Sequence, residues 1–482
     1  MRATVAMAAL AVLAGCSGSN KAGSSGSTGT SSETAATTTS SSSGSSTAAN
    51  TDSGSTSAGT TTSSSTSSTT GNVGSSSGST TNTAGSSGSS TTTSTGSTSS
   101  TTTGGSSGSS GSTFVVASHP AWTHVPDNGG PVLDAPELLV ITFSVDATGN
   151  DGGYPFESDM EGLGNWIVGS TWLTSVGTEY GVNSATAAVP VRLTNPPPAQ
   201  LSDTGIRALL EQGMTAGTIP VPDNSERIYM LFLPADVTVS SPSFNGTGCV
   251  DFEGYHWMAS LSVNGTSYDV PYAVILDCNL AGAGLTEQQQ IEVAASHEFI
   301  EASTDPSPES NPAFEIVDNA DPWHAFGGEV ADLCVSDNMR AFGTTYTVQR
   351  SWSNTAAQGD GSPCAPALTI GTPPSPRTFL GVAPIAPHVL TVTAGQTTNI
   401  TLEGWSTADH ILDWPVAATV VKSDLNLAPT VTPSSVNNGT TATLSIPIPS
   451  NAPSGDQALL WVYTTQGTQN DAQWWPLVLQ VQ

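Results

Sequence analysis

The middle of the chain alternates between short apolar runs and longer amphipathic stretches. Apolar runs at Glu137–Phe143 and Ile228–Leu233 predict buried strands. Amphipathic stretches at Phe156–Tyr180 and Ser202–Met214 predict helices that bury one face. Strands and helices that alternate in this way are typical of an α/β or α+β domain, which we assign to residues 113–366.

A hairpin and one further helix complete this domain. The runs His256–Val263 and Val270–Leu276 flank a short turn sequence and predict two paired strands. Thr286 and Gln289 fit a capping box. Helix formers then continue from Glu287 to about Ser303, so a helix is expected directly after the hairpin.

The last part of the chain has a purely β pattern. It follows a Pro-rich linker at residues 367–377. Turn residues separate short apolar runs at Val389–Val392, Asn399–Leu402, Ala442–Ile448, Leu459–Thr464 and Trp475–Val481. Roughly 100 residues of this kind predict an immunoglobulin-like or fibronectin-like β-sandwich, at residues 378–482.

The first 16 residues form a candidate export signal. Arg2 precedes an apolar run from Ala3 to Leu13 that is too short to span a membrane comfortably. The sequence Leu13-Ala14-Gly15-Cys16 resembles the bacterial lipobox, which implies cleavage before Cys16 and acylation of its thiol. Acyl chains anchor by burying methylenes at about 0.8 kcal/mol each. We therefore expect a lipoprotein of the cell envelope, at the outer membrane or cell surface, with an ordinary secretory signal as the alternative.

Residues 17–112 are almost entirely Ser, Thr and Gly. A segment of this composition cannot bury enough apolar surface to fold, so we expect a disordered tether. Its root-mean-square span would be on the order of 50–60 Å. That length would lift a folded domain clear of a crowded surface.

The charge balance disfavours one class of partner. The chain has 9 basic and 39 acidic residues, for a formal net charge of −30. The tether contributes only Lys21, Glu33 and Asp52, so the acidity belongs to the folded part. Because an acidic surface repels phosphate backbones, nucleic acid is not an expected partner.

Apart from Cys16, the chain has an even number of cysteines. Cys249, Cys278, Cys334 and Cys364 allow three pairings in an exported protein. We favour Cys249–Cys278 and Cys334–Cys364 because they close the shorter loops, each contributing about 3–4 kcal/mol. None has CxxC spacing, so a thiolate zinc site is disfavoured.

The helix after the hairpin carries the strongest candidate chemistry. His297 and Glu301 are four residues apart, so they lie on one helical face and can bind one metal ion. Asp305 continues that face by one more turn. Glu298 is positioned to act as a general base towards a water. The spacing follows the logic of H-E-x-x-H zinc sites, with Glu301 in place of the second histidine.

A second acidic cluster follows in the loop that contains Cys334. Glu329 is the expected third ligand, and Asp332 or Asp305 could serve as a fourth ligand or support the others. One imidazole with several carboxylates favours Zn²⁺, with Ca²⁺ or Mn²⁺ as alternatives. The alternative interpretation of the whole motif is an amphipathic helix with solvated charges.

A family resemblance supports the metal interpretation. The motifs are Ser296-His297-Glu298-Phe299-Ile300-Glu301-Ala302-x-Thr304-Asp305-Pro306, then Gly328-Glu329-Val330-x-Asp332-x-Cys334, then Val348-Gln349-Arg350-x-Trp352-Ser353-Asn354. They resemble secreted bacterial proteins with a zincin-like core and, more distantly, plant Exordium-like phosphate-induced proteins. The resemblance covers the first domain only, and it implies an exported zincin-like α/β domain with a metal centre.

Other residues have weaker patterns. We expect His324 in a solvated acidic loop, His256 in packing or in a cleft wall, and His119 and His124 in stabilising the opening segment. Five tryptophans of the β region are expected to fill a core rather than to form a sugar-binding platform: Trp405, Trp414, Trp461, Trp474 and Trp475.

A serine hydrolase is disfavoured because no Gly-x-Ser-x-Gly elbow follows a strand. Glu298 and Glu301 share a helix and are poorly placed for a glycosidase.

Two functional hypotheses remain from the sequence. The first is a membrane-anchored metallohydrolase, most plausibly a zinc peptidase that acts on protein or peptide. The second is a non-catalytic adhesion or binding lipoprotein with a structural cation or with no metal. An open coordination position would distinguish the first from the second.

Overall fold

The computed structural model describes residues 113–150, 154–223, 226–241, 246–279, 285–335, 339–341, 345–387, 389–465, 467 and 469–482. The predicted signal segment, Cys16 and the predicted tether lie outside these ranges. No helix within the ranges is long and apolar enough to cross a membrane.

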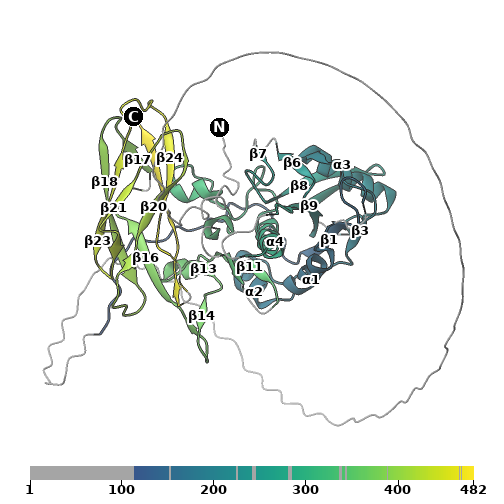
Figure 1. The fold of residues 1–482 in the computed structure, drawn as a ribbon. Helices are drawn as coiled ribbons and strands as arrows, with labels where there is room; N and C mark the ends of the chain where they lie inside the picture. The colour runs from purple at the N-terminus through teal and green to yellow at the C-terminus, as the bar shows by residue number, and fades with distance from the viewer. Residues whose placement is uncertain are drawn as a thin grey trace, which may run out of the picture. The chain divides into compact units, whose positions relative to one another are not determined.

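A mixed sheet forms the centre of the first folded part (Figure 1). Its order is β2-β1-β5-β9-β8, and β3 also pairs with β1. Its strands are β1 (Glu137–Phe143), β2 (Thr186–Ala187), β3 (Val191–Leu193), β5 (Arg227–Leu233), β8 (Gly254–Val263) and β9 (Thr266–Leu276). The three central strands are parallel, and β8 is antiparallel to β9 at one edge. The predicted strands and hairpin are confirmed.

Helices cover both faces of this sheet. The helices are α1 (Glu157–Ile167), α2 (Thr171–Gly177), α3 (Asp203–Ala216) and α4 (Glu287–Thr304). Leu138 and Val140 belong to the apolar core with α1, α2 and α4, whereas Leu139 and Ile141 belong to the core with α3. A strand that is buried on both faces has no polar alternation, which explains the continuous apolar run in the sequence.

The predicted helical stretch Phe156–Tyr180 is two helices. Ser170 has extended backbone angles and accepts a hydrogen bond from the backbone NH of Leu173, so it caps α2 and ends the continuity with α1. A short 3-10 turn, η2 (Thr178–Tyr180), follows.

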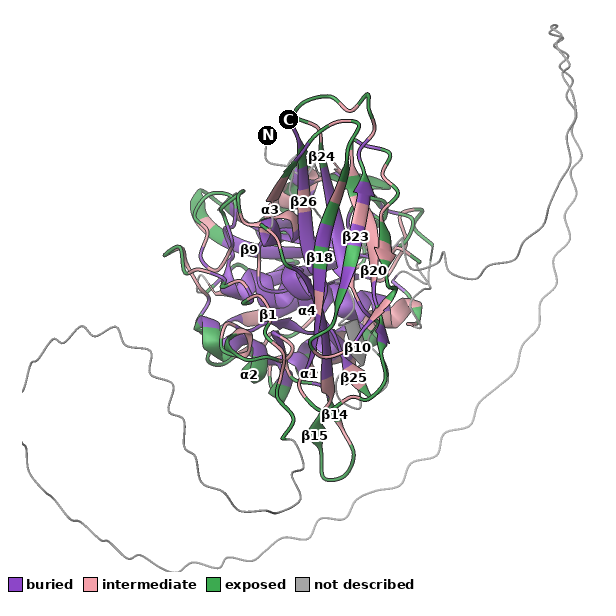
Figure 2. Ribbon diagram, turned by 90° about the vertical axis from the view of Figure 1, so that its left-hand side faces the viewer, coloured by how far each residue is buried: buried purple, intermediate pink, exposed green. Residues whose placement is uncertain are grey.

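Helix α4 is the central element of this part, and its purple ribbon in Figure 2 shows how fully it is buried. The predicted capping box is present, with Thr286 as N-cap and Gln289 bonding back to it. All residues from Gln290 to Thr304 are buried. Polar side chains on such a helix must find partners inside the protein, because water does not reach them.

Smaller elements surround these. They are β4 (Gln200–Ser202), β6 (Thr238–Ser241), β7 (Gly246–Thr247), η3 (Pro322–Phe326), η4 (Asp332–Cys334), β10 (Met339–Ala341), β11 (Thr347–Gln349), β12 (Ser351–Trp352), η5 (Ala356–Gln358), β13 (Cys364–Ala365), β14 (Thr369–Ile370) and β15 (Ser375–Pro376). Strands β14 and β15 pair as a small hairpin within the segment predicted as a Pro-rich linker.

The C-terminal part consists of two main sheets, as predicted for an all-β region. Their orders are β21-β23-β18-β16-β25 and β17-β26-β24-β20. The strands are β16 (Thr378–Pro384), β17 (Val389–Val392), β18 (Thr397–Ser406), β20 (Ala417–Ser423), β21 (Thr430–Thr432), β23 (Thr441–Pro447), β24 (Gln457–Tyr463), β25 (Asn470–Asp471) and β26 (Trp475–Val481). A minor pair joins β19 (Trp414–Pro415) to β22 (Ser435–Val436).

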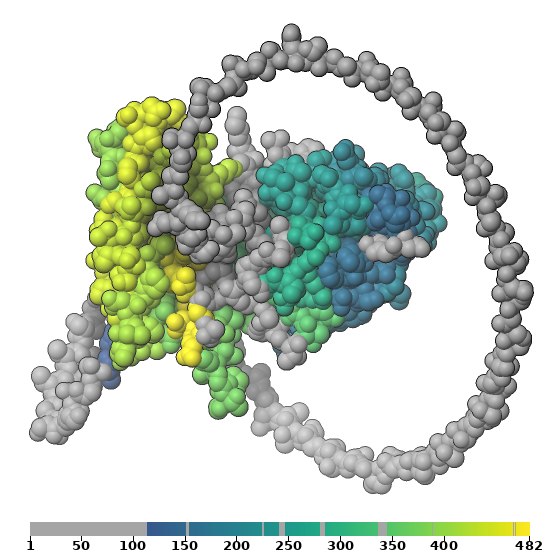
Figure 3. Space-filling view, viewed as in Figure 1, coloured from purple at the N-terminus to yellow at the C-terminus, as the bar shows by residue number. Residues whose placement is uncertain are grey.

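Contacts join the β region to the first part. One apolar cluster includes Phe299 of α4 and Leu460 of β24. Arg350, only 1% exposed, forms an ion pair with Asp471 at 2.9 Å. The five tryptophans of the β region are buried, in agreement with a core role. In the space-filling view, the β region appears in yellow-green (Figure 3).

Both predicted disulfides are confirmed. Cys249 pairs with Cys278, and Cys334 pairs with Cys364. The second bond ties the loop of the acidic cluster to β13.

Candidate metal centre

His297 and Glu301 meet on α4 as their spacing predicts. The Nε2 atom of His297 lies 2.9 Å from Oε2 of Glu301 and 3.6 Å from Oδ1 of Asp332. All three residues are buried, and their donor atoms lie within 4.8 Å of one another. The structure therefore brings two α4 side chains and one loop carboxylate together as a three-donor group.

Gln349 fixes the orientation of the His297 ring. The amide nitrogen of Gln349 donates to the carbonyl of Ala331 at 2.7 Å, which turns its amide oxygen towards Nδ1 of His297 at 3.0 Å. Because that oxygen only accepts, we assign an imidazole proton to Nδ1. Nε2 is the nitrogen that faces Glu301 and Asp332, and it would bind a metal ion once its own proton is displaced. A histidine that binds metal through one ring nitrogen usually donates a hydrogen bond from the other, which fixes the orientation of the ring.

Glu301 is held by backbone of the acidic loop. Its Oε1 accepts from the NH groups of Ala331 and Asp332, at 3.2 and 3.0 Å. Oε2 remains directed towards the imidazoles of His297 and His256, at 2.9 and 3.8 Å. One carboxylate oxygen therefore faces two imidazoles.

Glycine allows the loop to approach this closely. Gly327 has φ +128°, and a Cβ there would lie 1.7 Å from Oδ2 of Asp332. Gly328 also has positive φ, at +103°. The Cys334–Cys364 disulfide holds the same loop two residues after Asp332. The Gly-Gly pair and the cystine thus determine where Asp332 lies.

His256 belongs to the centre, although we expected it in packing or in a cleft wall. Its Nδ1 lies 3.2 Å from Oε2 of Glu298. Its Nε2 lies 3.0 Å from the carbonyl oxygen of Asp305 and 3.3 Å from Oε1 of Glu329. The spacing along α4 could not reveal this residue, because its position depends on how the edge strand β8 packs against α4.

The same edge strand lets Glu298 approach. A Cβ at Gly254 would lie 2.9 Å from Cγ of Glu298, so only glycine leaves this space. Gly254 and His256 are two residues apart on β8 and share one face. Glu298, predicted as the general base, therefore shares a donor group with His256 of β8 and with Glu301.

Asp305 and Glu329 lie at the margin of the centre. The carboxylate of Asp305 accepts from the NH groups of Ala313 and Ser307, at 3.0 and 3.4 Å, and shapes the turn after α4. Glu329, expected as the third ligand, contacts His256 on the side away from Glu298. Asp332, rather than Glu329, joins His297 and Glu301.

The centre holds more carboxylates than cations. Glu298, Glu301 and Asp332 are at most 9% exposed, and Asp305 is fully buried. Within the described ranges, no lysine or arginine forms a salt bridge with them. Buried carboxylates without compensating charge are costly, and a divalent cation would offset that cost.

The pKa values reflect this crowding. Burial disfavours the charged form of His297, but the charge and hydrogen bond of Glu301 outweigh it and raise the pKa of His297 to about 10. Burial, reinforced by the charge of Glu301, raises the pKa of Asp332 well above its usual range. For Glu301, burial is outweighed by His297, and its pKa is lowered. The centre therefore retains protons that a metal ion would displace.

The other predicted histidines lie elsewhere. Nδ1 of His324 bonds the carbonyl of Ile316 at 2.6 Å. The ring of His119 stacks on Trp405 with 4.3 Å between centroids, and His124 is exposed. None of them belongs to the donor groups of the centre.

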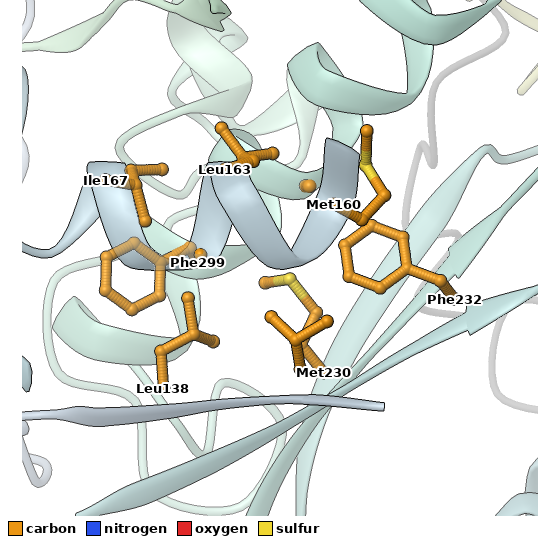
Figure 4. A pocket seen from close by; sticks show the side chains of 10 residues that line it. Leu138, Met160, Leu163, Ile167, Met230, Phe232 and Phe299 are labelled. Atoms are coloured by element: carbon orange, nitrogen blue, oxygen red, sulfur yellow. The ribbon is translucent and has the colours of Figure 1, made fainter. Parts of the chain in front are cut away.

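A small apolar hollow lies beside α4 where α4 packs against α1 and the central strands of the sheet. Figure 4 shows Met160, Met230 and Phe299 around a small apolar hollow between α1, α4 and the sheet. The space left among these side chains does not admit a water molecule.

Comparison with known proteins gives no family. No family model matches the chain, and no curated protein matches it. The solved structures that match include domains 4 and 5 of the S-layer protein SbsC, at 14% identity and TM-score 0.17, over 22% of this chain and 57% of that chain. Another is the CooA pilin subunit from enterotoxigenic Escherichia coli, at 11% identity and TM-score 0.17, over 22% of this chain and 97% of that one. The chain thus spans little more than half of the S-layer fragment. TM-scores of 0.17 are too low to support any argument about function.

Proposed function

We propose that the chain is a metallohydrolase with a zincin-like core and acts as a zinc-dependent peptidase. The observation that carries the proposal is the buried group of His297, Glu301 and Asp332, with its imidazole oriented by Gln349. One imidazole and two carboxylates suit Zn²⁺ and leave room for a fourth ligand. Helix α4 follows the hairpin β8–β9 directly, as the resemblance to zincins implies.

A divalent cation in this group would supply Lewis acidity towards a substrate carbonyl. Glu298 would take a proton from the attacking water as its oxygen bonds to the carbonyl carbon. The same carboxyl group would then give the proton to the leaving amine as the C–N bond breaks. His256 would hold Glu298 in position through the contact at Oε2.

The location of the protein is part of the proposal. The lipobox at Cys16 supports an exported protein that is anchored by lipid to the cell envelope. Two disulfides are compatible with an oxidising compartment. Protein or peptide in that compartment would be the substrate, and the β region, of immunoglobulin-like type by its sequence pattern, would hold or position it.

Glu298→Gln tests the mechanism. The amide keeps the size of the side chain but cannot accept the proton, so hydrolysis of a peptide library should fall by about 10²–10⁴-fold. The ion held by His297, Glu301 and Asp332 should be retained, and the thermal unfolding midpoint should stay close to the wild type. Gln358→Glu, at an exposed position, serves as the control for a change between acid and amide. Equal turnover by Glu298→Gln and the wild type would contradict the mechanism.

Burial of the donors favours one second candidate, a non-catalytic binding lipoprotein with a structural cation. His297 and Glu301 are only 2% and 3% exposed. A structural site is closed around its ion, whereas a catalytic one keeps an exchangeable position. Cobalt substitution separates the two, because only an open site changes its absorption spectrum when a small inhibitor anion is added.

A further inference from the structure

We propose that the centre holds a second cation, bound by His256, Glu298 and the shared Oε2 of Glu301. The proposal rests on the metal centre of the proposed function and deepens it. Two donor groups meet here, and Glu301 belongs to both. The first contains His297 and Asp332, and the second contains His256 and Glu298.

His256 has the bonding pattern of a ligand. Nε2 faces the carbonyl oxygen of Asp305 at 3.0 Å, and a carbonyl only accepts, so a ring proton belongs on Nε2. Nδ1 then faces Oε2 of Glu298, which is an acceptor when ionised. Without metal, a proton on Nδ1 satisfies this contact, and a bound cation would displace that proton. The N–H···O=C bond on the far nitrogen is the usual support of such a ligand.

The distances fit a metal ion. Nδ1 of His256 lies 3.2 Å from Oε2 of Glu298 and 3.8 Å from Oε2 of Glu301. Ligands at about 2.0–2.2 Å from one ion are separated by distances of this size. Oε1 of Glu301 is engaged by two backbone NH groups, so Oε2 is the atom that both donor groups share. An oxygen shared in this way sets two cations close together, as in two-metal sites.

Occupancy of the second position has a chemical consequence. Glu298 cannot accept a proton from water while its Oε2 binds a cation. The first cation would therefore support hydrolysis, whereas the second would hold the general base and suppress it. Metal concentration would then regulate the enzyme through His256.

Manganese binding to the whole chain tests the second position. At saturating Mn²⁺, equilibrium dialysis should give two ions per chain. Electron paramagnetic resonance should show an exchange-coupled multiline spectrum, because the two ions share one oxygen. A count of one ion with the six-line spectrum of isolated Mn²⁺ would overturn the second position and leave the first. A count of zero would also overturn the second position, and the same dialysis with zinc would then decide the metal centre of the proposed function separately.

Two variants assign the ligand. His256→Ala should bind one Mn²⁺ and give the six-line spectrum. His324→Ala is the matched control, since that imidazole bonds a backbone carbonyl outside the centre, and it should keep both ions and the coupling. Two coupled ions in His256→Ala would contradict the assignment. The wild-type count and spectrum decide the proposal even if the variant fails to fold.

Discussion

The Nε2 atom of His297 lies 2.9 Å from Oε2 of Glu301, one helical turn further along α4. This pair is buried in the middle of the first folded part, with Asp332 as the third donor. The helix supplies the spacing, but the neighbouring strand and loop supply the orientation.

Gln349 should control metal affinity without binding metal. Gln349→Leu removes the acceptor for Nδ1 of His297 and the donor to Ala331. We expect zinc affinity to fall by about 10–100-fold, as for other residues that orient metal ligands. Competition with a chromophoric chelator measures this. Gln358→Leu is the control, because that side chain is exposed; equal affinities of the two variants would argue against the role of Gln349.

The two disulfides should differ in function but not in stability. Their sequence separations are 29 and 30 residues, so removing either should lower the free energy of unfolding by about 3–4 kcal/mol. Only Cys334–Cys364 holds the loop of Asp332. Replacing that pair with serine should therefore weaken zinc binding, whereas replacing Cys249 and Cys278 should not. Equal zinc affinities after both replacements would contradict this division, and chemical denaturation checks the stabilities.

Arg350 should be important for the stability of the fold. Arg350→Met leaves Asp471 as a buried carboxylate without its ion-pair partner. Breaking a buried pair in this way costs about 3–5 kcal/mol. Arg192→Met is the control, because its ion pair with Glu161 is at the surface and should matter little. Comparable unfolding midpoints of both variants in urea would disprove the role of Arg350.

Asp277 should make stability depend on pH. Burial raises the pKa of Asp277 from 3.8 to about 6, so the folded state binds its proton more tightly than the unfolded state. The contribution of protonated Asp277 to the free energy of unfolding is fully present below about pH 4, and it is lost as pH rises towards 6. Asp277→Asn should therefore gain stability relative to the wild type between these values. Thermal unfolding from pH 3.5 to 7 measures the difference, with Asp409→Asn at an exposed position as the matched control.

Local sequence signals predicted the elements of the fold well. The bounds of β1, β17 and β26 agree with their predicted ranges, and Thr286 caps α4 as expected. Strands β16 and β20 were not predicted. Thr378–Pro384 is apolar and buried beyond its first residue, but it directly continues a Pro-rich segment. Ala417–Ser423 is only half-buried and has no strong apolar pattern.

The candidate site was most predictable along the helix, and Asp332 of the loop was expected only as a fourth or supporting ligand. His297, Glu298 and Glu301 follow from spacing, because a helix repeats every few residues. The position of His256 depends on the packing of β8, and the choice of Asp332 over Glu329 depends on the positive φ angles of Gly327 and Gly328. Such long-range relationships are set by tertiary packing, which no local pattern contains.

Elemental analysis tests the metal centre most directly. The whole chain would be equilibrated with zinc, dialysed and measured beside a His297→Ala/Glu301→Ala double variant. We predict at least one zinc ion per chain in the wild type and a loss of that ion in the variant. Zinc at the same background level in both proteins would contradict the metal centre, and with it the proposed hydrolase.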